Sequence, residues 1–182
     1  ERNQRNYTKL LSGRIGVDYD ISDRSSIGIQ YLGNTSRPDI DEVGNTTIFN
    51  RITNGIDSLI ITNGQSDIKL YYHSLNTHFK SELDSLGKNI SVDIDYLKYN
   101  NIRSRLNDTR NVLADGTFIT GSENIFKNNS EQDIETFTSA VDIEFPVEFA
   151  NFSFGGKISF TENNSNIQTF ISENEVFIID AN

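Results

Sequence analysis

Residues 68–103 have the sequence IKLYYHSLNTHFKSELDSLGKNISVDIDYLKYNNIR, and this stretch decides the fold. Its apolar and polar residues alternate with a period of two, which is typical of β-strands that have one apolar face. Between the two alternating arms lies Asp84-Ser85-Leu86-Gly87. Asp at the first position and Gly at the last are typical of a type I turn. The stretch therefore predicts an antiparallel hairpin with arms of about 68–83 and 88–103.

The register of this hairpin follows if Leu83 pairs with Lys88, because each pair of facing residue numbers then sums to 171. Both faces stay self-consistent under this register, as a half-buried hairpin requires. The apolar pairs are Phe79–Val92, Thr77–Ile94 and Leu75–Tyr96, and the polar pairs are His78–Asp93 and Lys80–Ser91.

Two further hairpins show the same alternation, one on each side of the first. Residues 7–31 form the earlier one, with its turn at Ser22–Ser25. Residues 137–160 form the later one, with its turn at Pro146–Asn151, so that Phe145 faces Phe152 and Lys157 lies diagonal to Asp142. We expect long polar loops at about 34–67, 100–133 and 162–182. Each of these contains a short apolar run able to extend a strand or to pair locally.

The order of short and long connections favours one architecture among the all-β folds. Short turns follow the odd strands, and long connections follow the even ones. Transmembrane barrels combine short periplasmic turns with long extracellular loops in this way. We therefore predict an antiparallel meander of about seven or eight strands, with residues 1–182 forming a single β-barrel segment. As an isolated piece it is expected to form an open, curled or sandwich-like sheet, because both edges are then unpaired.

The composition bounds the class of protein. The chain has no Cys, so a disulfide framework is impossible. No stretch approaches the roughly 18 consecutive apolar residues of a transmembrane helix, whereas a transmembrane barrel needs apolar residues only at alternate positions. The net charge of −10 disfavours nucleic-acid binding through a basic patch. Because the chain opens at Glu1 without a leader, we interpret it as a fragment or a processed chain.

The sequence carries no recognisable catalytic, metal or cofactor motif, so we expect no enzyme activity and no cofactor. His73 and His78 are the only histidines, and five residues apart on a strand they point to opposite faces. The Asp- and Asn-rich loops lack the spacing of a calcium loop. A GxSxG element, a Gly-rich phosphate loop and a dinucleotide fingerprint are all missing.

The alternation sorts the candidate functional residues into two sets. In a barrel, charged residues on the polar side would line the lumen and could contact a plug, although ordinary solvated charges explain them as well. The polar set is Arg14, Asp18, Asp20, His78, Lys80, Asp93, Asp95, Asp142, Glu144 and Lys157. The set expected to face lipid is Phe79, Val92, Ile94, Tyr96, Phe137, Val141, Ile143, Phe145, Phe152, Phe154, Ile158 and Phe160. Tyr7, Tyr19, Tyr31, Tyr96 and Phe145 are expected near strand ends, where an interfacial aromatic girdle would lie.

Several segments together resemble the outer-membrane β-barrel family related to TonB-dependent receptors of Gram-negative bacteria. They are Gly16–Gly28, Leu83–Lys88, Ile90–Tyr96, Ser139–Pro146 and Phe154–Lys157, and the likeness spans nearly the whole chain. The resemblance implies a barrel of about twenty strands with an N-terminal plug. It also implies that the whole protein imports a ligand across the bacterial outer membrane. It implies outer-membrane lipid, the plug of the parent chain and an imported ligand as partners.

One alternative stays open at this point. A soluble, secreted β-sandwich or adhesin-like binding module would use the same apolar faces as its dry core. The two readings differ in where the Phe-rich side lies, against hydrocarbon or inside the protein.

Overall fold

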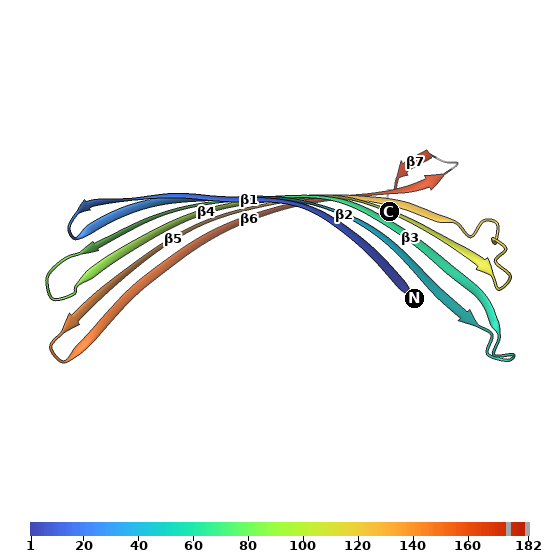
Figure 1. Cartoon of the computed structure of the whole chain (residues 1–182), viewed down its shortest axis with the longest axis horizontal. Helices are drawn as coiled ribbons and strands as arrows, with labels where there is room; N and C mark the ends of the chain where they lie inside the picture. Colours follow the sequence, from blue (N-terminus) through green and yellow to red (C-terminus); the bar gives the residue numbers. More distant parts are fainter. Residues whose placement is uncertain (174–175, 181–182) are drawn as a thin grey trace.

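The computed structural model describes residues 1–173 and 176–180 as one seven-stranded antiparallel sheet. The strands follow one another in space in chain order, which makes a simple meander. They are β1 (Arg2–Ser22), β2 (Ser25–Phe49), β3 (Ile56–Glu82), β4 (Asn89–Leu113), β5 (Asn124–Val147), β6 (Ala150–Glu173) and β7 (Val176–Ile179). Figure 1 shows a single-layer arch whose edges do not meet. The predicted all-β meander is confirmed, and it forms an open, curved sheet.

The central hairpin has the register that its sequence predicts. Phe79 faces Val92 and His78 faces Asp93, and the same sum of 171 holds from Ser58–Leu113 to Glu82–Asn89. At its turn, Asp84 accepts hydrogen bonds from the backbone N–H groups of Leu86 (2.9 Å) and Lys88 (3.1 Å). Gly87 has a φ of 94°, a backbone conformation that L side chains rarely adopt. The turn chemistry therefore fixes the register of two long strands.

The expected long loops are wrong, because most of those residues continue the strands. Residues 34–49 belong to β2, 56–67 to β3, 100–113 to β4, 124–133 to β5 and 162–173 to β6. The actual connections at that end are residues 50–55 and 114–123. Asn, Asp and Ser are common in these segments, yet several polar residues lie opposite another polar residue in the ladder, as in the pairs Asp41–Gln65, Asn100–Asp133 and Ser104–Asn129. Cross-strand pairing therefore overrides the loop-like composition.

The third hairpin turn is also tighter than predicted. Pro146 and Asn151 pair with each other within the ladder, and so do Val147 and Ala150. Only Glu148 and Phe149 lie between the two strands. The first turn, at Asp23-Arg24, and the pairing of Phe145 with Phe152 agree with the sequence-based prediction.

The sheet has no conventional core. Among the described residues, Val112 is the only large apolar side chain that is buried. Phe154, Ile158 and Phe160 are each more than 60% exposed. The alternative of a β-sandwich with a dry interior is therefore not what the chain forms. So much exposed apolar area requires a nonaqueous neighbour.

Candidate functional site

The register separates the two predicted sets of residues completely. All twelve residues expected to face lipid lie on one side of the sheet, here called the band face. All ten residues of the charged set lie on the other side, here called the polar face.

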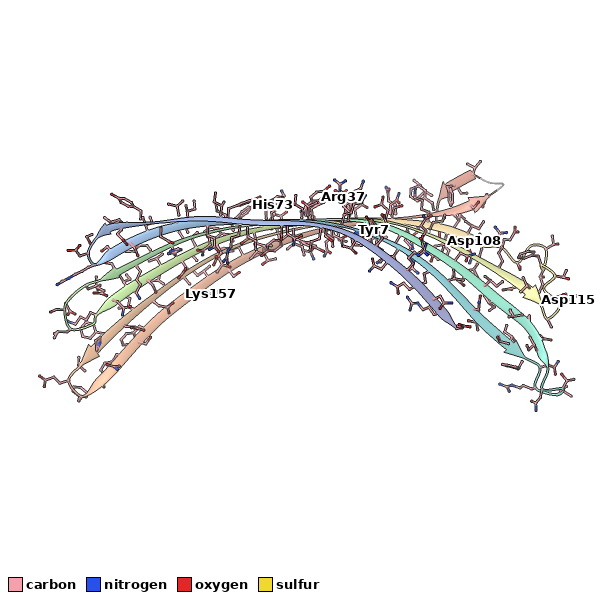
Figure 2. The ribbon with its side chains drawn as sticks, viewed as in Figure 1. Tyr7, Arg37, His73, Asp108, Asp115 and Lys157 are labelled. Carbon is pink, nitrogen blue, oxygen red and sulfur yellow. The ribbon has the colours of Figure 1, made fainter. Side chains whose placement is uncertain are left out.

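The two faces also differ in crowding. The buried polar side chains Ser66, Asn107 and Thr138 all lie on the polar face. Side chains converge on the concave side of a curved sheet and splay apart on its convex side. Figure 2 accordingly shows His73 and Arg37, both of the band face, on the convex side of the arch. The polar face is therefore the inner face of the curve.

The apolar residues of the band face form a continuous band beside the short turns. In one cross-strand row, Tyr19, Ile27, Phe79, Val92 and Val141 lie side by side on five strands. The band ends at a row that contains His73, Lys98, Glu135 and Glu162. It spans about ten residues of each strand, the length that a tilted strand needs to cross a hydrocarbon layer. The strands themselves are 21–27 residues long in β1–β6.

Aromatic residues mark the polar margin of this band. Tyr19 and Phe145 lie near strand ends as expected, whereas Tyr31 and Tyr96 lie farther inside β2 and β4. The Tyr31 hydroxyl lies 2.6 Å from His73 Nδ1, and the two rings are stacked with centroids 6.0 Å apart. Tyr96 donates a hydrogen bond to Glu135 (3.0 Å), which also accepts one from Lys98 (2.6 Å). Aromatic rings with polar tips on charged neighbours are typical of a membrane–water interface.

On the polar face, one carboxylate from each of the first two pairs joins a network of side-chain contacts. Asp18 lies 2.9 Å from His78 Nε2. His78 Nδ1 lies 3.2 Å from the side-chain oxygen of Asn76, whose amide nitrogen donates to Asp95 (2.7 Å). Asp93 faces His78 across the β3–β4 ladder. These contacts connect β1, β3 and β4 near the short-turn end of the sheet.

The third carboxylate pair lies apart from this network. Glu144 accepts a hydrogen bond from Asn89 (2.7 Å), and Asp142 faces Gly155, which leaves room for its carboxylate. Arg14, Lys80 and Lys157 form no ion pair within residues 1–173 and 176–180. The structure thus brings His78 together with Asp18 and, through Asn76, with Asp95, and leaves the three predicted cations separate.

Sequence reasoning missed an arginine cluster farther along the polar face. Asn101, Arg103, Arg105 and Asn107 alternate along β4 and share this face. The period-two signal is present in the sequence, but the polar composition of residues 100–133 predicts a loop there. Its alternation with Ile102 and Leu106 could have revealed the strand.

Neither a helical span nor a metal centre emerges from the described chain. None of its segments is a helix with the length and hydropathy for a membrane span. Across residues 1–173 and 176–180, no three His, Asp or Glu side chains are grouped to hold a metal ion. His73 and His78 lie on opposite faces, as their spacing predicted.

A single-layer antiparallel meander with one apolar band and one polar face defines a segment of a transmembrane β-barrel. A sequence model described as the outer membrane protein beta-barrel family matches residues 81–182. This match covers more than half of the chain, and the chain belongs to that family, which places it in the bacterial outer membrane.

Comparison with solved structures finds similar chains, among them a bacterial receptor. BauA, the ferric preacinetobactin receptor from Acinetobacter baumannii, matches with 12% sequence identity and a TM-score of 0.43. The match covers 94% of this chain and 29% of that receptor, so the chain spans less than a third of the receptor's length. No protein in the curated collection of sequences matches.

Proposed function

We propose that this chain forms part of the wall of an outer-membrane transporter or channel, with its band face in lipid and its polar face lining an aqueous lumen. One observation carries the proposal. Across β1–β6, the apolar band lies on one face of the sheet and the predicted charged residues lie on the opposite face. Alternate residues of a barrel strand face lipid and lumen, so one strand serves both surfaces. The role is non-catalytic.

The band sets the depth of the sheet in the membrane. The segment beside the short turns crosses the hydrocarbon, and the short turns face the periplasm. A strand of about 25 residues is about 80 Å long, so more than half of each strand extends beyond the outer surface. The connections at residues 50–55 and 114–123 then lie outside the cell.

The carboxylate network lies at the level of the band, inside the proposed lumen. Asp18, Asp93 and Asp95 give this part of the lumen a net negative charge. Asp18 lies beside His78, and Asp95 accepts a hydrogen bond from the neutral Asn76. A plug of the parent chain with a basic surface is the partner that fits this charge. The ligand that passes the barrel would enter from the wide outer end.

Single cysteines test the assignment of faces, because this chain contains no native Cys. In the whole outer-membrane protein, Val141→Cys and Phe160→Cys should resist a membrane-impermeant maleimide and react with a lipid-soluble one. Ala140→Cys and Ser159→Cys, the neighbours on the polar face, should react with the impermeant reagent. Equal labelling of both sets would overturn the proposal. Liposomes that contain the protein without its plug should also show solute flux above that of empty liposomes.

A further inference from the structure

The arginine cluster of β4 differs in charge from the rest of the polar face. Beside the short turns, that face carries seven carboxylates, namely Asp18, Asp20, Glu82, Asp93, Asp95, Asp142 and Glu144, against the three cations Arg14, Lys80 and Lys157. Farther along it, β4 contributes Arg103 and Arg105, two residues apart and on the same side. In a chain with a net charge of −10, this is a local concentration of positive charge.

Arg103 has no counterion. It forms no ion pair within the described residues, and its one side-chain hydrogen bond is a long one (3.4 Å) to the Ser66 hydroxyl. The residues nearest to it on the polar face of β3 and β5 are all uncharged: Ser66, Ile68, Leu70, Asn128, Ser130 and Gln132.

Arg105 is only partly neutralised. Its guanidinium lies 3.6 Å from Glu42, but Glu42 is closer to Arg2, at 2.7 Å. Arg105 also donates a hydrogen bond to Asn107 (3.0 Å). One carboxylate therefore serves two guanidinium groups, and the group as a whole keeps a positive charge.

Three buried polar atoms of the same area lack a hydrogen-bond partner among the described residues. They are the Arg103 Nε–H, the Asn101 Oδ1 and the Asn128 Oδ1. The first is a donor and the other two are acceptors. Leaving such atoms unpaired is costly, so most buried polar groups in proteins have a partner. Asn101 and Arg103 are two residues apart on β4, and Asn128 of β5 faces Arg105, so the charged donor and the two neutral acceptors lie at neighbouring positions of the polar face.

We infer that this group binds a small hydroxylated anion, such as a sugar phosphate or a sugar acid, in the outer half of the lumen. A guanidinium holds carboxylate or phosphate through paired hydrogen bonds. The two amide oxygens are buried in the ligand-free protein, so neighbouring side chains must move aside before they accept hydrogen bonds from hydroxyl groups of the same ligand. The inference rests on the proposed function, since it requires the polar face to be open to solute.

Calorimetric titration of the whole outer-membrane protein in detergent, at low salt, tests the inference. The probes are glucose 6-phosphate, glucuronate and neutral glucose. Both anions should bind at least about tenfold more tightly than glucose, because a hydrogen bond to a charged group contributes that much affinity. Arg103→Gln should weaken both anions about tenfold, and Arg103→Lys should weaken them less. Arg105→Gln should have a smaller effect, because Arg105 already shares Glu42.

Arg37→Gln is the matched control, since Arg37 lies at nearly the same level of the sheet but on the band face (Figure 2). It removes the same charge and should leave the affinities unchanged. Gel migration before and after boiling confirms that each variant is a folded barrel. Equal binding of glucose and the anions, or equal anion binding by Arg103→Gln and the parent protein, would overturn the inference.

The two proposals can fail separately. If Arg103→Cys reacts with impermeant maleimide and liposomes show flux, while Arg103→Gln binds anions normally, only the anion site is wrong. If flux is absent but Arg103→Gln loses anion binding, the transport function is wrong and the anion site stands.

Discussion

The Asp18 carboxylate lies 2.9 Å from His78 Nε2 although their strands are not neighbours. β2 lies between β1 and β3, and the residue it places between the two side chains is Gly28. A Cβ atom at Gly28 would overlap both the Asp18 carboxylate and the His78 ring. Glycine is thus required here for close approach across a strand, which is one of the meanings of glycine within a sheet.

Substitution of Gly28 by Ala should therefore separate the pair. The overlap falls on the ends of two side chains, which can move apart, so we expect a loss of about 1 kcal/mol in the free energy of unfolding. Gly13→Ala is the control, because a Cβ there has no atom within 4 Å. It should be neutral or stabilising by about 0.5 kcal/mol, since alanine lowers the entropy of the unfolded chain. Urea unfolding from lipid bilayers measures both values, and equal effects would contradict the role assigned to Gly28.

The band face should reject charge where the polar face accepts it. Val141 lies within the apolar band, and Ala140 is its neighbour on the polar face. Val141→Arg should cost about 2–4 kcal/mol, the range for arginine at the bilayer midplane on a barrel's lipid face. Ala140→Arg should cost less than about 1 kcal/mol, since it faces Asp93 and Lys157 in a solvated setting. The free energy of folding into bilayers measures the difference, and similar costs would argue against a lipid-facing band.

Acid should weaken the central turn through Asp84. The Lys88 ammonium group, at 3.0 Å, and the backbone N–H groups of Leu86 and Lys88 lower the pKa of this carboxyl below its ordinary value. A pKa that is lower in the folded state contributes stability above the unfolded pKa of about 3.9. That contribution is lost as the pH falls through the folded pKa.

Asp84→Asn should accordingly lower stability at neutral pH and flatten the fall in stability below about pH 4. Asp23→Asn makes the same change in the first short turn, where the Asp23 side chain forms no hydrogen bond within the described residues. It should leave the acid profile unchanged. The measurement is the unfolding midpoint between about pH 2 and pH 7. The same dependence on pH in both variants would refute the role assigned to Asp84.

Sequence reasoning succeeded where alternation was sharp and a turn fixed the register. Asp84 and Gly87 located one turn, and the register of Phe79 with Val92 and of Phe145 with Phe152 followed. The two sets of facing residues were also separable, because a period of two assigns every second residue to one side.

It failed where polar residues fill both faces. Around Arg37 and Asp67, and again around Arg103 and Asn129, neither face is apolar, so composition alone indicated loops. These strands form because the ladder continues from the apolar segments, and this cause is not visible in a local window. The arginine cluster was missed for the same reason. Its counterion balance depends on Glu42 and Arg2, which come from two other strands.

The orientation of the sheet in the membrane yields a prediction about its two ends. The connection 50–55 contains Asn54 with a φ of 54° and Ile52 with 95% of its surface exposed, so it is an open tip without packing constraints. An epitope inserted between Asn54 and Gly55 should be tolerated, since exposed tips accept insertions, and an antibody should detect it on intact cells. An epitope between Glu148 and Phe149, in the two-residue turn at the other end, should be detected only after the outer membrane is permeabilised. If the antibody detected only the second insertion on intact cells, the proposed orientation would be wrong. The arginine cluster would then lie on the periplasmic side.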